Sequence, residues 1–182
     1  LDTNKLSINN IETNNTCNLN CPMCDTLSSR RKKINMELEN METIILAAKK
    51  INSKNNRLVS FHSVGEPMVS PQFEEYLKML NKHGFKMSLS TNGLLVERKL
   101  DILLKYSHII EEIRFSIDGA TKQTYELMRF PAKYEKLIHN LEVFTKANKG
   151  KKYFKNVKMS SVICKATLPE LALHYEVYSK YF

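Results

Sequence analysis

SPQFEEYLKMLNKHGFKMSLSTNG, residues 70–93, carries the signals of one helix and of the strand that follows it. Ser70 stands at an N-cap position, Pro71 at the first helical position, and two glutamates follow in the first turn, whereas Gly84 stands just past the helix. The apolar residues after this glycine alternate with polar ones, as in a strand: Phe85, Met87 and Leu89. We therefore expect a helix over 71–83 and a strand over 85–89 that ends in Ser-Thr-Asn-Gly.

The same alternation of strand and helix continues on both sides of this stretch. Strand-like apolar runs lie at 58–61, 113–117 and 157–163, with a weaker one at 6–11. Apolar residues at helical spacing lie at 38–48, 95–104, 137–144 (with Gly150 after it) and 168–181. Strand and helix thus alternate five times. This pattern is typical of an α/β fold with a parallel sheet and right-handed crossovers, either a doubly wound sheet or part of a (β/α) barrel.

The composition is that of one globular domain. The chain has 182 residues, of which 42% are hydrophobic and 26% charged, which excludes a wholly disordered protein. The longest strictly apolar run, 44–48, is far too short to cross a bilayer, so no membrane partner is expected. No charged-then-apolar leader opens the chain.

The net charge of +9 favours polyanions in general. Two clusters carry much of it, 30–33 and 149–155. The simpler interpretation is a soluble surface rich in lysine. A nucleic-acid groove is the alternative, with Tyr153 and Phe154 as interleaved aromatic residues in the second cluster only.

Polar and reactive motifs recur where the expected strands end. They are 17–24, 65–67, 90–93, 116–119 and Cys164. The carboxyl ends of parallel strands meet at one edge of a sheet, where α/β enzymes collect their sites. We therefore expect these five motifs to form a single site.

The cysteines of the first motif suit a metal. Cys17, Cys21 and Cys24 bring three thiolates onto one short loop, and thiolates suit zinc or iron–sulfur clusters. Structural zinc requires four ligands, so His62 or Cys164 would have to join them. Three cysteines fit a cubane cluster with one iron left open for another ligand. Three inert buried cysteines are the remaining interpretation, which the polar loop disfavours.

Together these motifs resemble those of the radical S-adenosylmethionine (radical SAM) enzymes. The resemblance rests on the C-x3-C-x2-C loop at 17–24, on Val64-Gly65-Glu66-Pro67 in place of Gly-Gly-Glu-Pro, and on the motifs at 90–93 and 116–121. The segment 11–19 resembles members that carry a C-terminal SPASM or twitch extension. Val64 departs from the family pattern, because a glycine there leaves more room for backbone approach.

The resemblance implies a partial (β/α)6 TIM-like barrel and a defined chemistry. Residues 1–182 would be the radical SAM core domain, with the last βα unit and any SPASM or twitch extension lying outside this chain. Its cofactors would be a [4Fe–4S] cluster and S-adenosylmethionine (SAM). One electron would cleave SAM to methionine and a 5′-deoxyadenosyl radical, which would abstract hydrogen from a peptide, sugar or other metabolite.

The resemblance also assigns roles to matching positions. Cys17, Cys21 and Cys24 would bind three irons, and Arg129 would pair with the SAM carboxylate. The other SAM contacts would be an adenine neighbour at Met23, an amino-group site at Gly65, Glu66 and Pro67, ribose or methionine contacts at Thr91 and Asn92, and a hydrogen bond from Ser116.

Several positions keep a simpler interpretation. Arg129 fits a solvated helix end, and Asn92 and Asp118 fit ordinary turns with the glycines after them. Ile163 fits either an adenine contact or the core of a strand. We expect Cys164 to be a small buried hydrophobe, although a contact with substrate or a second metal is an alternative.

The implied partners are a small-molecule or peptide substrate and an external electron donor of the flavodoxin or ferredoxin type. An oxygen-sensitive cluster implies a reducing cytoplasm. Two other functions remain as alternatives: a non-catalytic iron–sulfur or zinc domain, and an RNA-modifying member of the same superfamily. Nucleic acid is a possible partner but not the favoured one.

Overall fold

A four-stranded parallel sheet organises the chain. The computed structural model describes residues 6–26, 28–52 and 56–182. The strands are β1 (Leu58–Phe61), β2 (Lys86–Thr91), β3 (Ile110–Ser116) and β4 (Val157–Ser160). They pair in sequence order, β1-β2-β3-β4. A doubly wound sheet reverses its order, whereas right-handed crossovers in an unbroken order place the helices on one side, as in a barrel. The strand order therefore selects the partial (β/α) barrel.

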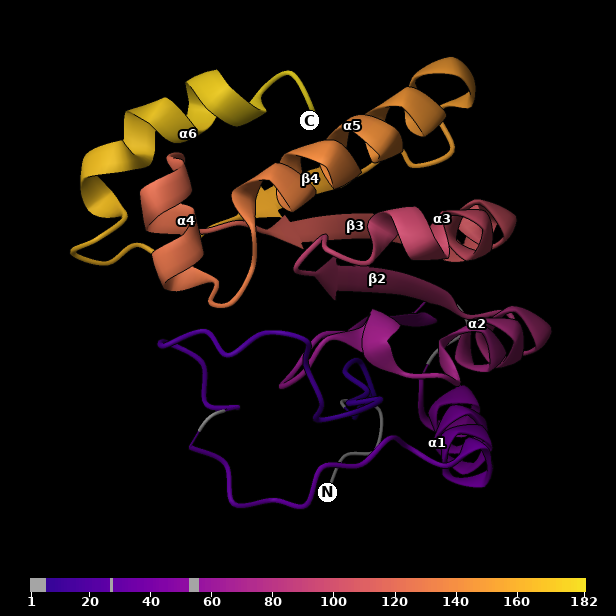
Figure 1. Ribbon diagram of the computed structural model, residues 1–182. Helices are drawn as coiled ribbons and strands as arrows, with labels where there is room; N and C mark the ends of the chain where they lie inside the picture. Colours follow the sequence, from indigo (N-terminus) through magenta and orange to yellow (C-terminus); the bar gives the residue numbers. More distant parts are fainter. Residues whose placement is uncertain (1–5, 27, 53–55) are drawn as a thin grey trace.

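The helices follow their strands along the sheet (Figure 1). The α-helices are α1 (Leu38–Ile51), α2 (Phe73–Lys82), α3 (Val96–Lys105), α4 (Lys122–Met128), α5 (Tyr134–Lys151) and α6 (Leu171–Tyr178). Short 3-10 turns are η2 (Pro67–Val69), η3 (Ser107–Ile109) and η4 (Leu168–Glu170). Contacts join α1 to α2 and α3 to α5, so these four helices form a layer beside the sheet.

The two faces of the sheet differ in chemistry, because successive strand residues point to opposite faces. One face is apolar and fully buried in the core with α2 and α5, through residues such as Phe61, Leu89 and Phe115. The other face is polar and half-buried, and its members include Ser88, Ser90, Glu112, Arg114 and Ser116. The helices thus take one face for stability, and the polar face remains available for a site.

The prediction of a first strand at residues 6–11 is wrong. Residues 6–11 form only an isolated parallel bridge, between Asn10 and Ser60. The Ile11 N–H donates to the Ser60 carbonyl at 3.0 Å, so the segment lies beside β1 as expected. It carries few apolar residues, of which Ile11 is the buried one in the core, and pairing stops after one bridge. The chain therefore leaves the sheet early and enters the cysteine loop.

Helix α4 was not predicted. It follows β3, and its N-cap is Thr121, whose hydroxyl accepts from the Thr124 N–H at 3.3 Å. Its seven residues are too few to show a helical period. This helix matters for the site because Arg129 is its C-cap residue.

Two helix ends also differ from the positions that the sequence predicts. Helix α2 begins at Phe73, because Ser70 forms a turn in which its hydroxyl accepts from the Gln72 N–H at 3.2 Å. Helix α5 continues through Gly150 to Lys151. Its left-handed residue is Lys152, with φ 48°. In both cases the sequence signal lies two residues before the observed cap residue of the helix.

Candidate functional site

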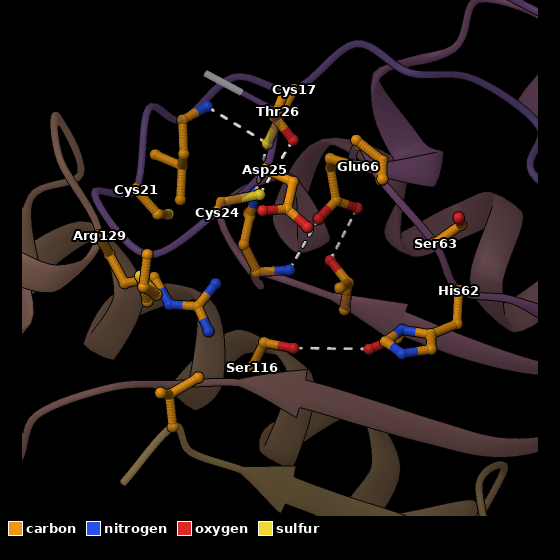
Figure 2. Close-up of a pocket in the computed structure, with 18 residues that line it drawn as sticks. Cys17, Cys21, Cys24, Asp25, Thr26, His62, Ser63, Glu66, Ser116 and Arg129 are labelled. Atoms are coloured by element: carbon orange, nitrogen blue, oxygen red, sulfur yellow. Dashed lines mark hydrogen bonds between the residues drawn. The ribbon is translucent and has the colours of Figure 1, made fainter. Parts of the chain in front are cut away.

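A cavity of about 320 Å³ lies at the carboxyl ends of the strands. It brings together most of the predicted site residues: Cys17, Cys21, Met23, Cys24, Gly65, Glu66, Thr91, Asn92, Ser116 and Arg129. Pro67 is not in the lining, since it is buried as the first residue of η2. Asp25, Thr26, His62, Ser63, Val64, Ser90 and Val162 also contribute to the wall. In Figure 2 the Arg129 guanidinium extends into the space between the cysteine loop and the strand end that carries Ser116.

The cysteine loop is held by local hydrogen bonds rather than by a helix or strand. The Leu19 N–H donates to Cys17 Sγ at 3.4 Å, and the Cys24 N–H donates to the Cys21 carbonyl at 3.0 Å. Leu19 is buried in the core, and the adjacent Asn20 N–H donates to the Phe130 carbonyl at 2.6 Å. These contacts fix where the three thiols lie relative to α4.

Gly65 is required where the second motif meets the lead-in to this loop. Its φ is +111°, and a Cβ there would lie 2.7 Å from the Asn14 carbonyl oxygen and 2.8 Å from that of Thr16. The Glu66 N–H donates to the same Thr16 carbonyl at 2.8 Å. The glycine therefore allows close backbone packing within the protein, which is a reason that the sequence alone did not reveal.

The Glu66 carboxylate ties the segment after β1 to the end of β2. Its Oε1 accepts from Thr91 Oγ1 at 2.9 Å, and its Oε2 accepts from the Asn92 N–H at 2.7 Å. The Met68 N–H donates to Oε1 at 3.3 Å. Glu66 is 2% exposed, and burial raises its pKa to about 7 against these three donors. Glu66 is therefore not a solvated loop carboxylate, and most of its acceptor capacity is used inside the protein.

Asn92 has two roles that the structure shows directly. Its Oδ1 accepts from the Leu94 N–H at 3.0 Å, which is the ordinary turn chemistry expected before Gly93. Its Nδ2 donates to Asn18 Oδ1 at 2.9 Å and lies 3.8 Å from Cys17 Sγ. The turn after β2 therefore also positions the first cysteine.

Arg129 forms a buried ion pair with Asp118. The distance from Nη2 to Oδ2 is 2.7 Å, and the side chains are 14% and 0% exposed. Asp118 Oδ1 accepts from the Val162 N–H at 2.6 Å, so the aspartate also holds the segment after β4. Arg129 is consequently not a solvated helix end, and Asp118 is more than a turn residue.

Burial favours the protonated form of two of the three thiols, those of Cys17 and Cys21. Burial raises the pKa of Cys17 to about 11. Burial also raises the pKa of Cys21, and the Arg129 charge opposes this shift. A bound cation is needed to deprotonate such thiols, and metal binding releases their protons. The donor set, three soft sulfur atoms around one cavity, fits an iron–sulfur cluster.

The zinc interpretation is not favoured. Within the described ranges, no three Cys, His, Asp or Glu side chains are placed to hold one metal ion. His62 lines the cavity but is exposed, and Cys164 lies outside the lining. A tetrahedral site needs four ligands converging on one point.

Two residues of the last predicted strand lie elsewhere than expected. Ile163 is 61% exposed and outside the cavity lining, whereas its neighbour Val162 lines the cavity. Cys164 is half-exposed, not buried, and its Sγ lies 3.7 Å from Thr167 Oγ1. The strand ends at Ser160 because the following backbone bonds to Asp118 and Thr167 instead of to β3.

Comparison with known protein families gives one match over most of the chain. The family model of the Radical SAM superfamily matches residues 11–161. Mycofactocin maturase MftC of Mycobacterium tuberculosis is 27% identical over 168 residues, 91% of this chain and 40% of that protein. The cysteine-type anaerobic sulfatase-maturating enzyme of Clostridium perfringens is 27% identical over 177 residues, 91% of this chain and 45% of that enzyme. The chain thus spans less than half the length of these relatives.

Solved structures share the fold. Streptococcus suis SuiB bound to precursor peptide SuiA superposes with a TM-score of 0.76 at 19% identity, over 98% of this chain and 38% of SuiB. Native anSMEcpe with bound AdoMet gives 0.74 at 23% identity, over 96% and 48% of the two chains. In the described part of the chain, no helix is both long and apolar enough to span a bilayer.

Proposed function

The chain belongs to the radical SAM superfamily, and from this we propose that it forms the cofactor-binding core of a radical SAM enzyme, with residues 1–182 as one core domain. Members of the family are enzymes that use a [4Fe–4S] cluster and SAM, and relatives have been solved with AdoMet bound. The observation that carries the proposal is the single cavity that gathers three cysteines and the polar ends of β2 and β3.

Cys17, Cys21 and Cys24 would hold the cluster. Met23, between the second and third thiols in sequence, would contact the adenine as a polarisable apolar wall. Gly65, Thr91, Asn92 and Ser116 line the same cavity and would contact SAM. Pro67, which is buried and outside the lining, would act by fixing the loop. When bound, the cluster and SAM supply, on one-electron reduction, methionine and a 5′-deoxyadenosyl radical that takes a hydrogen atom from the substrate.

Arg129 and Glu66 would orient the charged ends of SAM. The Asp118 carboxylate fixes one side of the Arg129 guanidinium, which leaves a bidentate group with further donors to meet a carboxylate. Glu66 is bracketed by Thr91 and Asn92, so its contribution to an ammonium group would be a fixed negative field behind the wall. A carboxylate whose pKa is about 7 gains charge when a cation binds beside it.

For the substrate we propose a peptide, with a sugar or another small metabolite as the alternative class. Support comes from relatives: SuiB is solved with a precursor peptide, and anSMEcpe with a peptide beside AdoMet. An external electron donor of the flavodoxin or ferredoxin type would reduce the cluster, in a reducing cytoplasm.

The test is anaerobic reconstitution followed by iron counting and SAM cleavage with dithionite. We expect about four irons per chain and formation of 5′-deoxyadenosine. Cys21→Ala should abolish both and leave the far-ultraviolet circular dichroism unchanged, because the loop lies outside the sheet. The matched control is Cys164→Ala, which lies outside the cavity and should keep iron and activity. Full 5′-deoxyadenosine production by Cys21→Ala would refute the assignment.

A further inference from the structure

A basic segment lies against the lead-in to the cysteine loop. Residues 30–33 are Arg-Arg-Lys-Lys, and all four are exposed. This run carries much of the positive charge near the site, and the cavity chemistry does not use it: none of the four residues is in the cavity lining. The cofactor contacts proposed above therefore do not account for this segment.

The segment is fixed to the cysteine loop through its backbone. Asn15 is 4% exposed, and its amide clamps the segment at two points. Its Nδ2 donates to the Lys32 carbonyl at 2.8 Å, and its Oδ1 accepts from the Ile34 N–H at 2.8 Å. An antiparallel bridge between Asn14 and Asn35 continues the pairing. The backbone that carries these charges is therefore held in a defined place, unlike that of a solvated tail.

Two of the four cations are used inside the protein. Arg31 is paired bidentately with Glu12, at 2.6 and 3.1 Å. Lys33 Nζ donates to the carbonyls of Thr26 and Asn15, at 3.1 and 3.2 Å. Through Thr26, whose hydroxyl lies 2.9 Å from Cys24 Sγ, Lys33 is one residue away from a cluster cysteine.

The other two, Arg30 and Lys32, have no carboxylate partner within the part of the chain that is described. Asp25 is the nearby exposed acid in sequence and lines the cavity. With Asp25 and Glu12 counted, the surface keeps a positive balance. We call Arg30 and Lys32 the basic rim.

We infer that the basic rim is the docking surface for an acidic one-electron carrier protein. This rests on the proposed function, which requires one electron per SAM cleavage. The reduced carrier would lose one electron and the oxidised cluster would gain it, with no bond made or broken. Complexes between electron-transfer proteins have small interfaces and short lifetimes, and opposite charge steers the encounter of the two partners. A cationic surface on a hydrogen-bonded backbone beside the cysteine loop is suited to such an encounter.

The second basic cluster argues against a general polyanion surface. Residues 149–155 include the end of α5, which leads into the start of β4 and so lies at the opposite end of the sheet from the cavity (Figure 1). A nucleic acid spanning both clusters would have to cross the whole domain. The basic rim alone adjoins the residues that would hold the cluster.

The experiment compares two double charge reversals in the reconstituted chain, with reduced flavodoxin as the probe. Arg30→Glu/Lys32→Glu changes the rim, and Lys149→Glu/Lys155→Glu makes the same charge change at the far end, where both lysines are exposed. Bleaching of the cluster absorbance is followed by stopped flow at low and high salt. We expect the rim variant to slow reduction by flavodoxin about tenfold or more at low salt, with the difference shrinking at high salt.

Dithionite separates the possible failures. With this small reductant, the rim variant should bleach and cleave SAM like the parent chain. Equal slowing of both variants by flavodoxin, or no slowing, would overturn the docking assignment. Selective loss of RNA-oligonucleotide binding by the rim variant would assign the rim to nucleic acid instead. If the parent chain itself fails to bind iron or cleave SAM with dithionite, the proposed function fails.

Discussion

The sheet and the cysteine loop are stabilised in different ways. In β2 and β3 the residues that face the helices are fully buried, and stability comes from apolar area and packing. Residues 12–35 contain no helix or strand beyond isolated bridges in their described part, and asparagine side chains hold them to backbone groups. The comparison suggests that folding and cofactor loading depend on separate residues. Such a separation lets stability be changed without iron binding, and iron binding without much change in stability.

The largest change in stability should come from the sheet. Phe115 is fully buried and contacts the rings of Phe144 and Phe182 at 5.1 and 5.6 Å between centroids. Phe115→Ala should lower the free energy of unfolding by about 3–5 kcal/mol, because it opens a cavity in the core. Urea unfolding measures this loss. At a temperature where the variant is folded, its iron content should match that of the parent chain. A loss of iron in the folded variant would contradict the idea that folding and cofactor loading depend on separate residues.

A glycine pair tests the junction between the two regions. Gly65→Ala places a Cβ 2.7 Å from a backbone oxygen at positive φ. We expect the substitution to lower the free energy of unfolding by about 1–3 kcal/mol and to remove most of the bound iron. Gly150→Ala is the control, since nothing lies within 4 Å of its added Cβ. Inside α5 that change should stabilise by about 0.5–1 kcal/mol. Thermal unfolding and iron counts on both variants measure the two effects. Full iron loading of Gly65→Ala would show that iron binding does not need the close backbone approach at residue 65.

Asn15→Ala should affect loading more than folding. The substitution leaves the Lys32 carbonyl and the Ile34 N–H without their buried partner, which costs about 1–3 kcal/mol locally. Reconstituted iron per chain should fall, while the urea midpoint of the sheet moves little. Asn20→Ala is the control, because Asn20 is exposed and only its backbone N–H is used in the loop. Equal iron in both variants would remove the clamp from the account.

Glu66 links the two regions, and its titration makes the free energy of unfolding depend on pH. Burial raises its pKa from 4.5 to about 7, so between these pH values the folded chain binds more protons than the unfolded chain. The stabilising contribution is therefore complete below about pH 4.5 and is lost as the pH rises through 7; a rise in pKa from 4.5 to about 7 corresponds to about 3 kcal/mol. Urea unfolding of the cluster-free chain from pH 5 to 8 measures the slope. Glu66→Gln should flatten it, and an unchanged slope would assign the titration elsewhere.

The sequence could predict that the residues of the candidate site lie together, because this follows from the order of the parallel strands. Thr91 and Ser116 end neighbouring parallel strands, so their approach needs no knowledge of side-chain packing. The same reasoning failed after β4. There Asp118 takes the Val162 N–H and turns the chain away from β3, which no local pattern indicated.

The Arg129–Asp118 pair shows what kind of information was missing. The two residues are eleven positions apart and meet only because α4, a helix too short to show a period, reverses the chain between them. Likewise, the reason for Gly65 lies in the backbone of residues 14 and 16. Long-range contacts of this sort depend on the assembled fold, whereas strand ends and turn residues are written locally.

The alternation along β3 has an evolutionary consequence. Ile113 and Phe115 belong to the core, whereas Glu112, Arg114 and Ser116 belong to the polar face. We therefore expect neighbouring positions to differ in what limits their substitution: folding at the core positions, and the chemistry of the cavity at Ser116, which lines it. Saturation mutagenesis of β3, scored separately for abundance and for turnover, would show two tolerance profiles offset by one residue.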